Sequence, residues 1–89
     1  MKAHANGIDI HYEVSGSGPW VTLSHSLFCD RTMWDPQMAA LEHHFSVLRF
    51  DTRGHGKTDA PAGAYTLAQM AGDVIGLLNA LKIERTHFV

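Results

Sequence analysis

The chain has 89 residues, of which 45% are hydrophobic, and a formal net charge of −2. That length allows one small domain or a piece of a larger one, and the charge offers no basic surface to a nucleic acid. No apolar run approaches the roughly 20 residues that cross a bilayer, so we expect no membrane partner. The single cysteine, Cys29, cannot form an internal disulfide, and we expect a reducing, cytoplasmic location.

The first part of the chain has the pattern of β-strands. Asn6-Gly7 is a strong hairpin signal between residues 2–5 and residues 8–14. Apolar and polar side chains alternate over residues 8–14, which predicts a half-buried strand at an antiparallel edge. After a break rich in serine and glycine, residues 20–23 are mostly apolar and predict an interior strand, which a loop over residues 24–32 follows.

A short amphipathic helix and a further strand come next. The helix is expected to begin at Asp35-Pro36, because aspartate can cap a helix and proline suits its first turn. Its apolar side chains recur at helical spacing: Trp34, Met38, Leu41 and Phe45. Residues 46–50 predict the next strand, and residues 51–63 form a loop punctuated by glycine and proline.

The second helix has the clearest start signal. Thr66 and Gln69 have the spacing of a capping box, and Tyr65 can form a hydrophobic staple with Met70. Its apolar stripe is long: Leu67, Met70, Ala71, Val74, Leu77, Leu78 and Leu81. Residues 85–89 then predict a buried strand.

Strands and helices that alternate in this way indicate an α/β fold with a mostly parallel sheet. Parallel strands need neighbours on both sides and helices on both faces, and two helices cannot cover five such strands. We therefore expect a continuation or a second chain to supply the missing layers. Val89 should then be shielded from solvent.

Two loops are expected to contain the chemistry, because ligands in open α/β sheets bind beyond the carboxyl ends of the strands. The first follows the strand at residues 20–23 and contains His25-Ser26-Leu27. The second follows the strand at residues 46–50 and reads Asp51-Thr52-Arg53-Gly54-His55-Gly56-Lys57-Thr58-Asp59. The order of these motifs, with a helix near Trp34 between them, resembles the α/β-hydrolase superfamily. Residues 51–61 and 77–83 most resemble the 3-oxoadipate enol-lactonases within it.

The resemblance implies an α/β-hydrolase fold, a mostly parallel sheet with flanking helices, in which residues 1–89 form the N-terminal portion of a single domain. In such hydrolases the strand that resembles residues 86–89 runs into a Gly-x-Ser-x-Gly nucleophile elbow, and the acid and histidine come later still. The chain would thus end just before the elbow and contain no triad residue. The nucleophile would be a serine, or the aspartate that dehalogenase relatives use.

By resemblance, this portion supplies half of an oxyanion hole. The backbone amide of Leu27 is the candidate donor to the charge that develops on the acyl oxygen. Many relatives have glycine where this chain has Ser26, and a side chain there restricts the backbone. We expect Ser26, Phe28 and Trp34 to contact substrate, although Phe28 and Trp34 also suit a plain core. His25 is expected to order its loop by hydrogen bonding and not to act as the base.

The resemblance implies a structural role beside the active-site entrance for four residues: Arg53, Gly54, His55 and Gly56. Arg31 or Arg53 could meet a substrate carboxylate, the alternative being a solvated surface arginine. The seven histidines lack the spacing of a zinc motif, so we expect no metal, and the resemblance implies no cofactor. Cys29 is expected to be a small buried thiol.

The expected reaction is therefore hydrolysis of a carboxylic ester or lactone, with 3-oxoadipate enol-lactone as the favoured small-molecule substrate. The alternatives are a related carboxylesterase, a cofactor-free haloperoxidase, and a truncated module that only binds a partner. Nucleotide binding is disfavoured. Gly56-Lys57-Thr58 matches the end of a P-loop, but Asp51 stands where that motif needs glycine, and residues 59–63 break the chain where it needs a helix.

Overall fold

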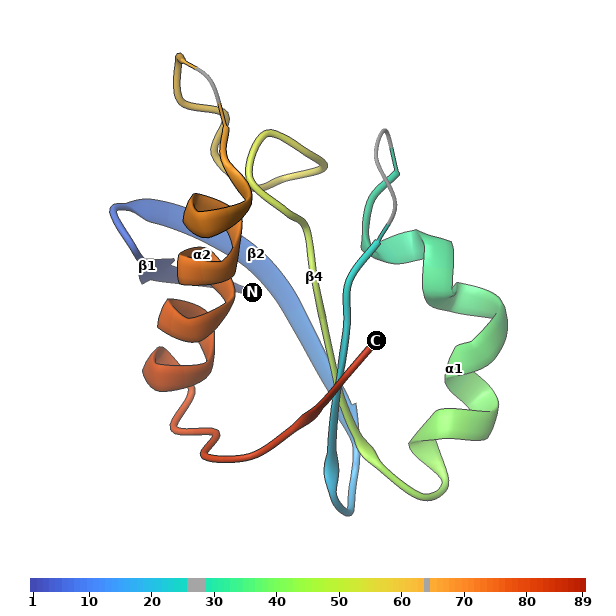
Figure 1. Cartoon of the computed structure of the whole chain (residues 1–89). Helices are drawn as coiled ribbons and strands as arrows, with labels where there is room; N and C mark the ends of the chain where they lie inside the picture. The colour runs from blue at the N-terminus through green and yellow to red at the C-terminus, as the bar shows by residue number, and fades with distance from the viewer. Residues whose placement is uncertain (26–28, 64) are drawn as a thin grey trace.

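The structure, a computed structural model, describes residues 1–25, 29–63 and 65–89. Its strands lie in one sheet, in the order β1-β2-β4-β3-β5 (Figure 1). Their bounds are β1 Lys2–Ala5, β2 Ile8–Gly16, β3 Trp20–Leu23, β4 Ser46–Phe50 and β5 His87–Phe88. β3 is parallel to both β4 and β5, whereas β2 is antiparallel to both β1 and β4. The α/β organisation is confirmed, but β2 lies inside the sheet and not at its edge.

The turn between β1 and β2 has the geometry that its sequence predicts. Asn6 and Gly7 have φ values of 50° and 82°, as a tight hairpin turn of the right twist requires. The Asn6 amide also donates a hydrogen bond to Asp73 Oδ1 at 2.8 Å. The hairpin is therefore tied to the second helix of the chain.

That second helix, α2 (Leu67–Ala80), begins with the predicted capping box. The Gln69 N–H donates to Thr66 Oγ1 at 3.0 Å, and the Thr66 N–H donates to Gln69 Oε1 at 3.4 Å. Leu77 is fully buried, but Leu67 is 86% exposed, so the predicted apolar stripe is wrong at its start. The Asn6 side chain of the hairpin reaches the helix at the Gln69 carbonyl, at 3.5 Å, and at Gly72, so Leu67 precedes the part of the helix that meets the hairpin.

The first helix, α1 (Asp35–Glu42), begins differently from the prediction. A 3-10 helix, η1 (Arg31–Trp34), leads directly into it, so Trp34 occupies the N-cap and Asp35 lies inside the helix. Asp30 caps η1 instead, because its carboxylate accepts the Thr32 N–H at 2.9 Å. Pro36 lies in the first turn of α1, as expected.

The two α-helices lie on opposite sides of the sheet (Figure 1), and each covers its own apolar cluster. The cluster on the α2 side consists of Ala5, Ile8, Ile10, Leu48, Phe50, Leu77 and Ile83. The cluster on the α1 side consists of Val21, Leu23, Met38 and Val47. β4 contributes to both, since successive side chains of a strand point to opposite faces.

The last strand differs most from its prediction. β5 has two residues, and both are exposed. Phe88 is 56% exposed and Val89 is 60% exposed, so the expected burial of this strand and of Val89 is wrong for the described chain. The reason is the strand order: β5 lies at the edge of the sheet and pairs with β3 on one side. Within the described residues, no helix is long and apolar enough to cross a membrane.

Candidate active site

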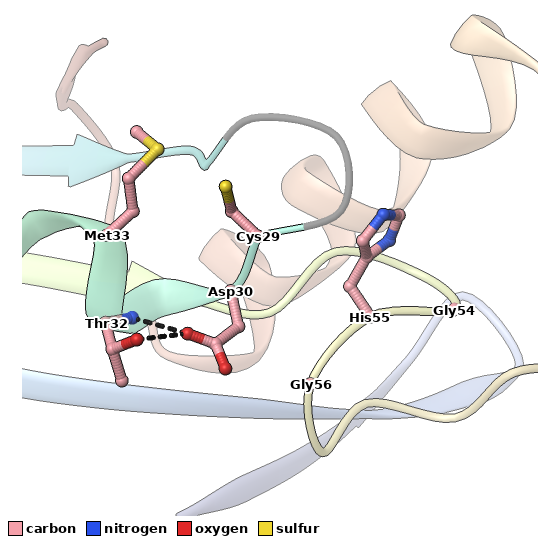
Figure 2. Close-up of a pocket in the computed structure, with 7 residues that line it drawn as sticks. All are labelled: Cys29, Asp30, Thr32, Met33, Gly54, His55 and Gly56. Carbon is pink, nitrogen blue, oxygen red and sulfur yellow. Dashed lines mark hydrogen bonds between the residues drawn. The ribbon is translucent and has the colours of Figure 1, made fainter.

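A cavity of about 550 Å³ lies where β3 and β4 end (Figure 2). We call residues 24–30 the β3 loop, of which 24, 25, 29 and 30 are described, and residues 51–63 the β4 loop. Both loops and η1 line the cavity through Cys29, Asp30, Thr32, Met33, Gly54, His55 and Gly56. β3 and β4 are parallel, so the cavity lies at the sheet edge where α/β proteins bind ligands.

Asp51 links the β4 loop to η1. Its side chain is fully buried at the end of β4. Oδ1 accepts the backbone N–H of Arg31 at 2.8 Å, and Oδ2 accepts the backbone N–H of Lys57 at 3.0 Å. The Arg31 guanidinium also donates to Oδ2, at 3.1 Å.

The far end of the β4 loop is bonded to β2. The Thr58 hydroxyl donates to the Asp51 carbonyl at 2.6 Å and accepts the His11 N–H at 2.9 Å. The Asp59 carboxylate accepts the Asp9 N–H at 2.9 Å. These contacts close the loop upon itself and fix it to the sheet.

Two histidines approach each other across the loops, with ring centroids 5.2 Å apart. The Thr52 N–H donates to His25 Nε2 at 2.9 Å, so this nitrogen is an acceptor and a neutral ring holds its proton on Nδ1. His55 Nδ1 lies 3.0 Å from the Arg53 carbonyl, which can only accept, so His55 also holds its proton on Nδ1. The Thr52 hydroxyl lies within hydrogen-bonding distance of both rings. The Nε2 lone pair of His25 is thus engaged by backbone.

Arg53 points away from the cavity into a buried ion pair. Its Nε donates to Asp73 Oδ2 at 2.9 Å, and its Nη2 donates to Asp73 Oδ1 at 2.7 Å. The two side chains are 7% and 5% exposed, and the Tyr65 ring lies 5.9 Å from the guanidinium carbon. Hydrogen bonding to Asp73 raises the pKa of Arg53. Neither a substrate contact nor a solvated surface position fits this arginine.

The Arg31 side chain also contacts groups of the protein itself. Besides Asp51, it approaches Glu13, with 3.1 Å between Nε and Oε1, as an ion pair and not as a well-aligned hydrogen bond. Burial lowers the pKa of Arg31, but the contacts with Glu13 and Asp51 outweigh this effect and raise it. The hypothesis that Arg31 binds a substrate carboxylate is therefore not supported by its surroundings.

The other predicted site residues lie in three different settings. Trp34 does not line the cavity: its Nε1–H donates to the Ser24 carbonyl at 3.0 Å, and its ring packs against the apolar cluster on the α1 side. Cys29 is exposed, so its expected burial is wrong, because it lies on the wall of the cavity. Ser26, Leu27 and Phe28 lie outside the described residues.

The sequence interpretation missed Asp30 and Asp51. The Asp30 carboxyl lines the cavity, and hydrogen bonds from Thr32 lower its pKa (Figure 2). An aspartate two residues before a threonine at a helix start is a recognisable capping signal. For Asp51 no local signal exists, because its partners come from separate parts of the chain. The described residues contain no group of three or more potential metal ligands.

The sequence model of the alpha/beta hydrolase fold family matches residues 19–89. The chain belongs to the α/β-hydrolase family. It is 38% identical to 3-oxoadipate enol-lactonase 1 of Acinetobacter baylyi, in an alignment that covers 99% of this chain and 34% of that protein. It is 41% identical to an epoxide hydrolase of Caballeronia sordidicola, over 94% of this chain and 26% of that protein.

Among solved structures, the α/β-hydrolase chain is similar to the enol-lactonase from Burkholderia xenovorans. The TM-score is 0.96 and the identity 51%, over 99% of this chain and 35% of that one. The fold and the resemblance to enol-lactonases are thereby confirmed. The chain spans about a third of the length of the enol-lactonases it matches.

Proposed function

We propose that residues 1–89 are the N-terminal portion of a single-domain enzyme that hydrolyses a carboxylic ester or lactone, with 3-oxoadipate enol-lactone as its substrate. The observation that supports this best is the similarity to enol-lactonases over nearly the whole chain, at 38% and 51% identity. The position of the cavity, beyond the ends of two parallel strands, is consistent with such a site.

In the proposed mechanism the remaining segment supplies the nucleophile elbow, the acid and the base. A serine attacks the lactone carbonyl, the ring oxygen leaves with a proton from the base, and water then releases the acid from the acyl-enzyme. The backbone N–H of Leu27 would donate to the oxyanion of the tetrahedral intermediate. One such donor is worth roughly 3–4 kcal/mol of barrier. No metal or cofactor is required for these steps.

The roles proposed for the other residues follow from their contacts. His25, His55 and Arg53 would hold the loops in place, since each is hydrogen-bonded within the protein. Gly54 and Gly56 would allow the left-handed backbone of the β4 loop, with φ of 78° and 50°. We keep substrate contact as the proposal for Ser26 and Phe28. For Trp34 the hydrogen bond to Ser24 favours a role in holding the β3 loop.

The test is turnover by the purified protein that contains this chain, with 3-oxoadipate enol-lactone, 4-nitrophenyl acetate and styrene oxide as parallel substrates. We expect lactone hydrolysis without added metal, at a kcat/KM far above that for the simple ester. Alanine in place of the elbow serine should abolish it. Faster hydrolysis of the ester would favour a carboxylesterase, and no turnover of any substrate would favour a binding module.

Epoxide opening is a second candidate, because the chain is 41% identical to an epoxide hydrolase over 87 residues. Turnover of styrene oxide without turnover of the lactone would establish it. A cytoplasmic location is proposed as well, in keeping with Cys29, which is a free thiol.

A further inference from the structure

The buried carboxylate of Asp51 contacts η1 and the β4 loop, both of which line the cavity. Its two oxygens take different backbone partners: Oδ1 accepts from Arg31, the first residue of η1, and Oδ2 accepts from Lys57 in the β4 loop. Only one residue, Asp30, separates Arg31 from the cavity residue Cys29. A shift of this carboxylate would therefore move both walls of the cavity.

The charge of Asp51 is balanced inside the protein. The Arg31 guanidinium donates to Oδ2 at 3.1 Å and is itself only 13% exposed. Two backbone N–H groups and one guanidinium N–H are all donors, so this position requires a group that only accepts hydrogen bonds. A carboxylate satisfies all three, whereas an amide of the same shape presents an NH₂ to one of them.

The backbone at Gly56 packs closely against the Asp51 carboxylate. A Cβ on Gly56 would lie 2.4 Å from Asp51 Oδ2, so the backbone of the β4 loop packs directly on this oxygen. Gly56 has φ of 50° and also lines the cavity. The carboxylate is therefore in contact with the wall of the cavity on one side and with the start of η1 on the other.

We propose that Asp51 is a positioning residue that fixes the start of η1, and with it the adjoining residues Cys29 and Asp30, against the β4 loop. This inference rests on the proposed function, in which the β3 loop supplies an oxyanion donor. Such donors must lie about 2.7–3.1 Å from the developing charge, and a misplacement of 1 Å can cost about 100-fold in rate. Asp51 acts through the Arg31 and Lys57 backbones and does not itself line the cavity.

Asp51→Asn in the full-length protein tests this role, because it keeps the shape and removes one acceptor. We expect kcat for 3-oxoadipate enol-lactone to fall at least tenfold while KM changes less than threefold. Glu13→Gln is the matched control: it makes the same chemical change on a carboxylate that contacts Arg31 but neither loop backbone, and it should change kcat less than twofold. Equal kcat in a folded Asp51→Asn variant and in the wild type would overturn the proposal.

Amide hydrogen exchange of the wild-type protein gives a second measurement that needs neither the variant nor the activity. The Arg31 and Lys57 amides should both be protected, and in a folded Asp51→Asn variant at least one should lose its protection. If the Arg31 and Lys57 amides of the wild-type protein both exchange as fast as exposed amides, the proposed role of Asp51 is refuted. If the wild type does not hydrolyse the lactone, the proposed function fails, and the exchange rates still decide whether Asp51 holds η1 to the β4 loop.

Discussion

The two loops beside the cavity are held in opposite ways. The β4 loop is closed by contacts of its own, and four of its side chains are buried: Asp51, Thr52, Arg53 and Thr58. The described part of the β3 loop has an exposed side chain at Cys29 and is held by bonds from other elements, to His25 from Thr52 and to Ser24 from Trp34. The β4 loop is thus held largely by its own contacts, whereas the described part of the β3 loop depends on Thr52 of the β4 loop and on Trp34 of η1.

This difference predicts where substitutions act. A change within the β4 loop should destabilise the fold, because buried polar groups lose partners. A change at a tether of the β3 loop should cost less stability and act mainly on the cavity. Four substitutions test this difference. The first two change the β4 loop, the third removes a contact to the β3 loop, and the last removes the His11 ring.

Gly56→Ala should have the largest effect on stability. Its Cβ would meet the Asp51 carboxylate at 2.4 Å, and its φ of 50° is unfavourable for a side chain. We expect a loss of about 3 kcal/mol or more in the free energy of unfolding, measured by urea denaturation. Gly7→Ala is the control, since Gly7 also has positive φ but a Cβ there would meet nothing within 4 Å. Equal losses in the two variants would show that the packing on Asp51 is unimportant.

Thr58→Val should come next. It removes the hydroxyl that pairs with the Asp51 carbonyl and the His11 N–H, and it leaves both buried groups without that partner. A loss of about 2–3 kcal/mol is expected in the same measurement. Thr58→Ser keeps the hydroxyl and should lose clearly less. A valine variant as stable as the serine variant would show that the Thr58 hydroxyl does not stabilise the β4 loop.

Trp34→Phe tests a tether of the β3 loop and should cost about 1–2 kcal/mol. The phenyl ring retains most of the packing but cannot donate to the Ser24 carbonyl. Trp20→Phe serves as the control, because no hydrogen bond of the Trp20 side chain occurs among the described contacts. Each variant leaves the other tryptophan of residues 1–89 in place, and far-UV circular dichroism reports unfolding. If the Trp20 variant is less stable than the Trp34 variant, the prediction is wrong.

The smallest effect should be a pH dependence from His11, whose backbone holds the β4 loop. Burial, and next the nearby Arg31 guanidinium, lower the pKa of its ring from 6.5, while the chain N-terminus, Asp51 and Lys57 add smaller effects. The unfolded chain therefore binds this proton at higher pH than the folded one. Stability should be complete above about pH 6.5 and should fall as the pH drops below it, until the folded ring also titrates.

His11→Asn removes this titration, so its unfolding free energy should change less with pH than that of the wild type between roughly pH 5 and 7. All other histidines are common to both proteins and cancel in the difference. Parallel pH profiles of the two proteins would show that His11 does not contribute.

Features with local causes could be predicted from the sequence. The hairpin turn at Asn6 and Gly7 depends on positive φ, and the start of α2 depends on two side chains three residues apart. The pairing of Arg53 with Asp73 could not be predicted, because a sequence pattern shows a charge but not the distant partner that it meets. Asp51 is the extreme case: an acidic residue in a polar loop gives no sign that its carboxylate is fully buried.

The same limit explains the error at β5. An apolar pattern predicts that a strand will be buried, but its burial depends on neighbouring strands and helices that the pattern does not identify. Among the described strands, β5 pairs with β3 alone, with His87 opposite Val21 and Phe88 opposite Thr22, and so lies at the edge. Likewise, the alternating pattern of β2 could not show that it pairs on both sides.

The pairing of β5 with β3 has a consequence for the order of folding. β1 and β2 are neighbours along the chain and can form their hairpin quickly, whereas β5 must find β3 across most of the sequence. Synthesis also releases β5 after β1, β2, β3 and β4. Until it docks, the edge of β3, with Val21 and Leu23, stays open to pairing with other chains. Nascent molecules are therefore exposed to aggregation until β5 pairs with β3.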